Sequence, residues 1–198
     1  MIRLHRILPW TLAAAALLAA GCSPDNGNNG TDQASAAPAV KKAVSSCVAV
    51  SAADASAMLS TTVTANRFAS DNAPRSICAY IDDKKETLAL INLEKGDKYP
   101  DQQKALADDQ KTAKTLFNGN VKPPVFHPAD GFMQGAFYAD ITPRYGVLEV
   151  HLYTFEAGYK LIISINNPPD FATGEKQAAA FAHKVFENIQ NGSAFVQL

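Results

Sequence analysis

The chain has 198 residues, of which 47 % are hydrophobic and 19 % are charged, and this length and composition exclude a fibrous protein or a charged tail. Its 18 Lys and Arg residues are balanced by 19 Asp and Glu residues, which gives a formal net charge of −1. Because a nucleic-acid surface needs an excess of basic side chains, we expect no nucleic-acid partner.

The first 21 residues have the pattern of an export signal. Arg3 and Arg6 precede an apolar run of 14 residues, 7–20, that contains no acidic side chain. A helix of this length spans about 21 Å, which is shorter than the roughly 30 Å hydrocarbon core of a bilayer. We therefore expect residues 1–21 to be removed as a signal peptide rather than to remain as a spanning helix.

The signal ends in Leu18-Ala-Ala-Gly-Cys22. This segment resembles the lipobox of bacterial lipoprotein precursors, with Ala19 at the position where the lipobox usually has Leu. The resemblance implies that Cys22 becomes the N-terminus and carries acyl chains, palmitate among them, that anchor the protein in a lipid bilayer. In a Gram-negative source, Ser23 in place of Asp implies sorting to the outer membrane, on its periplasmic or surface side. The alternative is an ordinary secretory signal with an unmodified Cys22, which also exports the protein.

Residues 22–46 are expected to form the lipidated N-terminus and a disordered tether, and residues 47–198 a single extracytoplasmic domain. The tether contains no aromatic residue, and Val40 and Val44 are its only branched aliphatic residues. So little apolar surface cannot offset the conformational entropy lost when a chain becomes ordered. All ten Phe and all six Tyr residues lie within 47–198, as expected for one hydrophobic core.

The three cysteines divide into one lipid site and one pair. With Cys22 assigned to the lipid, Cys47 and Cys78 remain as an even pair in an oxidising compartment, and we expect a disulfide between them. A metal or redox pair is the alternative. Neither cysteine has a His or carboxylate at ligand spacing beside it, however, and the chain contains no Cys-x-x-Cys.

A short capped helix is expected between these two cysteines. Ser51 and Asp54 have the spacing of a capping box, and the helix is expected to reach Leu59. Strands are expected at 61–64 and 76–82. The order of cysteine, capped helix and Cys78-Ala-Tyr80 resembles the extracytoplasmic sensor-like lipoprotein domains of bacteria. This resemblance implies an architecture rather than an activity.

The rest of the chain alternates hairpins and helices. A polar turn after the strand at 76–82 leads to a largely buried strand at 86–93. A surface helix is expected from Pro100 to about residue 116, and the main core helix at 174–190. The Pro-rich residues 121–128 are expected to form a loop that is either an interaction surface or a cover over a sheet edge. Together these elements predict an α+β fold, with an antiparallel sheet of about six strands packed by two or three helices, and one disulfide.

The second hairpin provides the candidate ligand face. A two-residue turn at Ala157-Gly158 places Val150, Leu152, Thr154, Leu161, Ile163 and Ile165 on one continuous apolar face. Four polar residues then share the other face, with Glu149 opposite Asn166 and His151 opposite Ser164. We expect this face to be either plain surface, a helix-covered surface or a shallow binding site.

No motif in the sequence identifies a reaction. The chain contains neither Gly-x-Ser-x-Gly nor Ser-x-x-Lys, and its histidines are scattered singly, so we expect no metal site and no cofactor. A hydrolase-like arrangement of Glu149, His151 and Ser164 is the enzymatic alternative, but a flat sheet offers no oxyanion donors. We expect a lipid-anchored, non-enzymatic domain that binds an envelope protein, with small-molecule binding as the other alternative.

Overall fold

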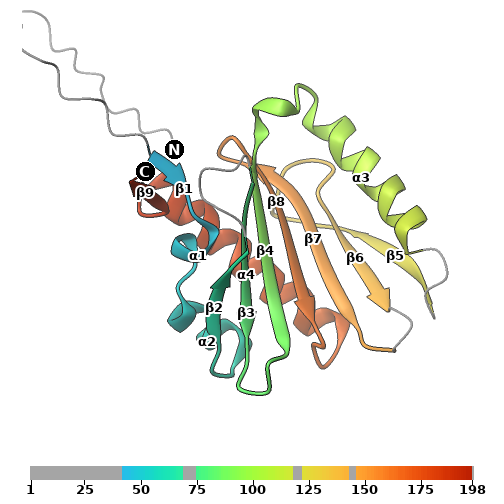
Figure 1. Cartoon of the computed structure of the whole chain (residues 1–198). Coiled ribbons are helices and arrows are strands. Elements are labelled where there is room, and N and C mark those ends of the chain that lie inside the picture. The colour runs from blue at the N-terminus through green and yellow to red at the C-terminus, as the bar shows by residue number, and fades with distance from the viewer. Residues whose placement is uncertain (1–41, 69–74, 118–121, 143–145, 198) are drawn as a thin grey trace, which may run out of the picture. The chain divides into compact units, whose positions relative to one another are not determined.

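A seven-stranded antiparallel sheet forms the centre of the domain (Figure 1). The computed structural model describes residues 42–68, 75–117, 122–142 and 146–197, so Cys22 and the signal lie outside the described residues. The α+β fold is confirmed, with one more strand in this sheet than the six expected. In spatial order the strands are β2 (Thr64–Arg67), β3 (Arg75–Ile81), β4 (Thr87–Lys95), β8 (Tyr159–Asn166), β7 (Glu149–Glu156), β6 (Phe137–Thr142) and β5 (Lys122–Pro128).

A second, two-stranded sheet joins the beginning of the folded body to its end. In this sheet β1 (Lys42–Val44) pairs with β9 (Phe195–Gln197), and the Ser45 N–H donates to the Ala194 carbonyl at 2.9 Å. The next residue, Ser46, is fully buried. The expectation that the disordered tether extends to residue 46 is therefore wrong for residues 42–46. Their order comes from backbone pairing with a strand about 150 residues away, which local composition does not reveal.

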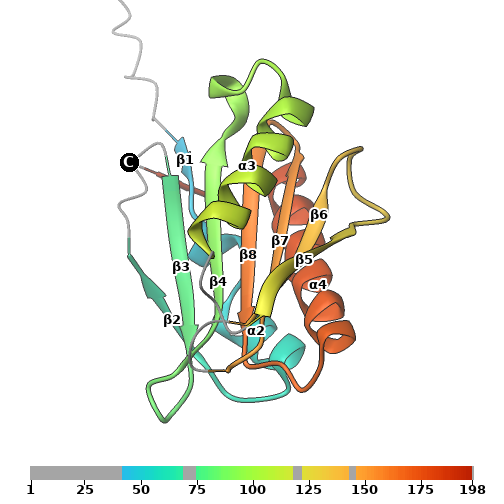
Figure 2. The ribbon, with the colours of Figure 1, turned by 90° about the vertical axis from the view of Figure 1, so that its right-hand side faces the viewer.

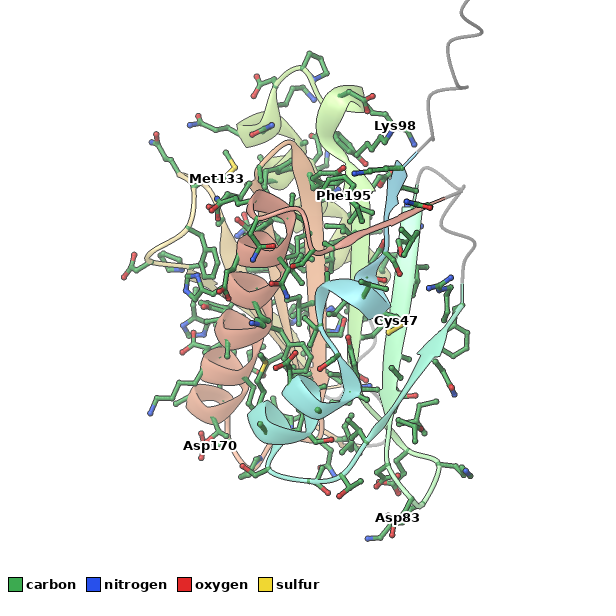
Figure 3. All side chains as sticks on the ribbon, turned by 90° about the vertical axis from the view of Figure 1, so that its left-hand side faces the viewer. Cys47, Asp83, Lys98, Met133, Asp170 and Phe195 are labelled. Carbon is green, nitrogen blue, oxygen red and sulfur yellow. A yellow bond between two sulfur atoms is a disulfide. The ribbon has the colours of Figure 1, made fainter. Side chains whose placement is uncertain are left out.

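The predicted disulfide between Cys47 and Cys78 is confirmed. It links α1 (Ser46–Ala49) to β3, with the two Cα atoms 5.1 Å apart, and Figure 3 shows it beside the labelled Cys47. Tyr80, two residues after Cys78 and on the same face of β3, donates its hydroxyl to the Val50 carbonyl at 2.8 Å. The Cys-x-Tyr segment therefore fastens this part of the chain to the sheet at two successive inward positions.

The capped helix after Cys47 is also as predicted. It is α2 (Ala52–Leu59), and the Ser51 hydroxyl accepts from the Asp54 N–H at 3.1 Å. The Asp54 carboxylate in turn accepts from the Ser51 N–H at 3.4 Å, which completes the capping box. The strand expected at 61–64 is displaced, since β2 begins at Thr64 and runs to Arg67.

The inner face of the sheet is covered by α1, α2 and the long helix α4 (Phe171–Gln190), which lie in front of the sheet in Figure 3. The helix begins three residues before the expected Gly174, because Asp170 caps it by accepting from the Thr173 N–H at 2.7 Å. Gly174 lies inside the helix and allows it to approach β7 closely, since a Cβ built there would be 2.5 Å from Val150 Cγ2. The buried face of α4 carries Ala178, Phe181, Ala182, Val185, Phe186 and Ile189.

The outer face of the sheet carries a smaller core beneath α3 (Gln102–Leu116), which crosses in front of the strands in Figure 2. The 3-10 helix η1 (Gly96–Lys98) leads from β4 to α3, and Asp101 caps α3 by accepting from the Lys104 N–H at 2.8 Å. Leu106 is buried against the sheet, whereas Leu116 at the end of the helix is 73 % exposed. None of the helices in the described part of the chain is long and apolar enough to span a membrane.

The Pro-rich segment expected as a loop is instead the edge strand β5. It pairs with β6, with Phe126 opposite Ala139 and His127 opposite Tyr138, and its register shifts between Lys122 and Val125. Proline has no backbone N–H to donate, but an edge strand pairs with a neighbour on one side only and so needs fewer donors. The register shift between Lys122 and Val125 accommodates the two prolines that lie between them. The segment is therefore the last strand at one edge of the sheet, and it contacts α3.

Candidate functional site

The hairpin register predicted from the sequence is confirmed. In the β7–β8 pair, Glu149 lies opposite Asn166 and His151 lies opposite Ser164. The inner face of the same pair is apolar apart from the buried Thr154, with Val150 and Leu152 fully buried. The four polar residues therefore share the outer face, which is the face that carries α3.

A polar row runs along β7 and has His151 at its centre. His151 Nε2 lies 3.2 Å from Glu149 Oε2, and His151 Nδ1 lies 3.5 Å from the Tyr153 hydroxyl. The row is partly covered, because the Phe117 ring at the end of α3 meets the His151 ring edge-on at 5.9 Å. Only 12 % of the His151 side chain and 28 % of the Glu149 side chain are exposed. This face is thus a helix-covered surface rather than an open one.

The two residues from β8 do not join this row. Asn166 donates its side-chain N–H to the Thr87 carbonyl at 2.9 Å, which ties β8 to the start of β4. Among the described side chains, His151 has its polar contacts with Glu149 and Tyr153 and not with Ser164. A nucleophile must lie within hydrogen-bond reach of its base, so the structure does not bring Glu149, His151 and Ser164 together as a catalytic triad.

Tyr153 is the member of the row that the sequence analysis did not select. Burial, reinforced by the negative charge of Asp109, raises the pKa of Tyr153 to about 12, so its phenol resists ionisation even in alkaline solution. Its ring stacks on Phe137 with the centroids 4.6 Å apart. The alternation of β7 placed Tyr153 on the outer face correctly, and burial under α3 is what changes its chemistry.

A buried ion pair holds α3 to the sheet. Lys160 of β8 places its Nζ 2.8 Å from Asp109 Oδ1 and 2.7 Å from Asp109 Oδ2, and only 9 % of the Lys160 side chain is exposed. The same ammonium lies 4.8 Å from the centroid of the Tyr99 ring. The ion pair therefore holds the side of α3 that carries Asp109 against β8.

The carboxylate of Glu94 organises the segment before α3. It accepts from Lys98 Nζ at 2.9 Å and from the Tyr99 hydroxyl at 3.0 Å, and Arg75 lies 3.5 Å away. Burial acts to raise the pKa of Glu94, but these hydrogen bonds and positive charges outweigh burial and hold the pKa below its ordinary value. Arg75 reaches Glu94 because the two residues are opposite one another in the β3–β4 pair, whereas Lys98 and Tyr99 reach it through the turn of η1 that follows β4.

A cavity of about 410 Å³ lies between α3 and the β5–β6 edge of the sheet. Its volume is within the range of sites that bind small molecules. Helix α3 lines it with four residues and the two strands with their connecting loop line the rest: Gln103, Leu106, Ala107, Gln110, Phe126, His127, Pro128, Gly135, Ala136 and Phe137. The sequence did not reveal this cavity, because one of its walls is the strand that was expected to be a loop.

The described histidines outside the polar row are packed against aromatic rings. His127 lies against Phe171 with the ring centroids 4.5 Å apart, and His183 stacks on Phe132 at 4.9 Å. Within the described ranges, no three His, Cys, Asp or Glu side chains gather closely enough to hold a metal ion. Comparisons with protein-family models, curated proteins and solved structures find no match to this chain.

Proposed function

We propose that the protein is a lipid-anchored, non-enzymatic binding domain of the bacterial cell envelope. The lipobox-like residues before Cys22 support the anchor, and the disulfide between Cys47 and Cys78 supports an oxidising compartment outside the cytoplasm. In a Gram-negative source, the anchor is in the outer membrane. A membrane-bound position then keeps the domain close to envelope components, and its own surface selects among them.

The cavity between α3 and β5 is the observation that carries the binding function. Its volume of about 410 Å³ accommodates a small molecule, and its walls come from a helix and strands that are fixed by the Lys160–Asp109 pair and by sheet hydrogen bonds. A rigid, mostly apolar cavity lowers the entropy cost of binding. In the polar row on β7, by contrast, the described polar contacts of His151 are with Glu149 and Tyr153 and not with the expected nucleophile Ser164, which favours binding over a Ser-His-Glu hydrolase.

An envelope protein is the second candidate for the bound partner. Phe68, at 64 %, and Leu116, at 73 %, are the most exposed of the large apolar side chains in the described residues. Exposed apolar side chains contribute to protein interfaces when they gather in one patch. Crosslinking of intact envelopes followed by affinity capture tests this candidate, and capture of the same protein by a Phe68→Ser, Leu116→Ser variant contradicts it.

The binding function is tested with protein purified from its own envelope. We expect a small molecule to copurify with the wild-type protein and to be lost from Ala107→Phe, because Ala107 lines the cavity and the added ring fills it. Solvent extraction and mass spectrometry measure this compound. Thr115→Phe is the matched control, since Thr115 is an exposed residue of α3 outside the described lining. Equal recovery from Ala107→Phe and wild type, or no copurifying compound, contradicts the proposal.

The anchor is tested separately. We expect metabolic labelling with palmitate to mark the wild-type protein and to disappear in Cys22→Ala, because the acyl chains are attached to that residue and to the new N-terminus it forms. Persistent labelling of the variant contradicts the anchor while leaving the cavity untouched.

A further inference from the structure

We propose that the cavity between α3 and β5 takes a neutral ligand that has an apolar body and a small number of hydrogen-bonding groups. This inference rests on the proposed binding function and specifies the chemistry of its ligand. Three features of the walls carry it: an apolar floor, two primary amides on one side of α3, and a described lining that contains no Asp, Glu, Lys or Arg.

The floor of the cavity is apolar and firmly packed. Leu106 and Phe137 are almost completely buried, at 1 % and 4 % exposure, and belong to the outer core. The Phe126 ring meets the Phe137 ring edge-on, with the centroids 5.6 Å apart. A ligand that covers these side chains removes apolar surface from water, which favours an apolar body.

The hydrogen-bonding groups come from one side of α3. Gln103 and Gln110 are seven residues apart, close to two helical turns, and Leu106 and Ala107 lie between them on the same side. A primary amide both donates and accepts, so it matches hydroxyl, amide or carbonyl groups of a ligand without needing charge. The Gln103 amide already donates to Gln134 Oε1 at 3.1 Å, which orients it beside the cavity.

Three charged side chains of α3 have ionic partners outside the lining. Asp109 pairs with Lys160 of β8, and Lys104 pairs with Asp108 on the exposed side of the helix. Lys114 lies over the ring of the lining residue Phe126, 5.3 Å from its centroid, but is not itself among the lining residues. A charged ligand that fills the cavity loses hydration without gaining an ionic partner among the described lining residues, and this cost selects neutral molecules.

Two fluorescent probes with the same ring skeleton test the selectivity for neutral ligands. N-phenyl-1-naphthylamine is neutral, and 8-anilinonaphthalene-1-sulfonate adds one negative charge. The protein is the chain from residue 22 onward, carrying Cys22→Ala so that no acyl chain competes for the probe, with the disulfide formed. We expect the neutral probe to bind at least about tenfold more tightly, because the sulfonate has no partner in the cavity.

Three variants link that preference to this cavity. Ala107→Phe is expected to weaken binding of the neutral probe about tenfold, and the exposed Thr115→Phe to leave it unchanged. Gln110→Lys places a cation in the wall and is expected to strengthen binding of the sulfonate probe about tenfold.

The outcomes separate this inference from the binding function on which it rests. If the sulfonate probe binds as tightly as the neutral one in the wild type, and Lys114→Gln removes that affinity, the selectivity for neutral ligands is wrong although the cavity still binds. If the Ala107→Phe substitution changes the binding of neither probe, the probes do not bind in the cavity and the inference on ligand chemistry fails. A compound that copurifies with the wild type and is lost from Ala107→Phe then still supports binding in the cavity.

Discussion

Removal of the Asp109 carboxylate tests whether the buried ion pair holds α3 over the outer face. In Asp109→Ala, the Lys160 ammonium stays largely buried, with 9 % of its side chain exposed, and loses its partner at 2.7 Å. Breaking a fully buried pair costs roughly 3–5 kcal/mol, and the 21 % exposure of the Asp109 side chain places this pair lower, at about 2–3 kcal/mol of unfolding free energy. The cation–π contact with Tyr99 remains in the variant and is too weak to compensate.

Urea denaturation measures this loss of unfolding free energy, and two further variants serve as controls. Asp108→Ala removes a carboxylate from the exposed Lys104–Asp108 pair of the same helix and is expected to change stability little. Asp109→Leu combined with Lys160→Met removes both charges and is expected to recover most of the stability, because no unpaired charge stays buried. If Asp109→Ala is no more destabilising than Asp108→Ala, the pair does not hold the helix and the reasoning is refuted.

Three other substitutions are expected to change the stability of the domain. Because Glu94 has a lowered pKa in the folded state, its contribution to stability is present above its unfolded pKa and is lost as the pH falls through the folded one. Glu94→Gln is therefore expected to flatten the loss of stability that urea titrations measure as the pH falls below the ordinary glutamate pKa. Replacing Cys47 and Cys78 by Ala opens a link with a sequence separation of 31 and is expected to cost about 3–4 kcal/mol in the same assay; an unchanged midpoint contradicts this. Gly174→Ala drives a Cβ into the Val150 side chain and is expected to cost about 1–3 kcal/mol by thermal melting, whereas a stabilised variant refutes the close approach.

Features set by short-range pattern could be predicted from the sequence. The register of the β7–β8 hairpin followed from alternation, since a one-residue slip moves every apolar side chain to the wrong face. The capping box at Ser51 and Asp54 is confined to four neighbouring residues, so tertiary packing did not override it. The link between Cys47 and Cys78 followed from counting cysteines in an exported chain.

Features set by distant partners could not be predicted. The strand β1 has only three residues, and it is ordered because β9 supplies its hydrogen-bond partners. The prolines of β5 indicate a loop by local preference, but the sheet edge tolerates them. The cavity needs both β5 as a wall and α3 on the outer face. The sequence predicted the surface helix but not the sheet face on which it packs, and it did not predict β5 as a strand.

Nuclear magnetic resonance mapping of the neutral probe on the isotope-labelled chain tests the binding site most directly. With N-phenyl-1-naphthylamine added to the Cys22→Ala protein, we expect chemical-shift changes to concentrate on the amides of Gln103 and Gln110, on those of 126–127, and on the Leu106 methyl groups, all of which surround the cavity. We also expect them to vanish in Ala107→Phe. Changes confined to the polar row of Glu149 and His151, or to the inner face beneath α4, would contradict the account.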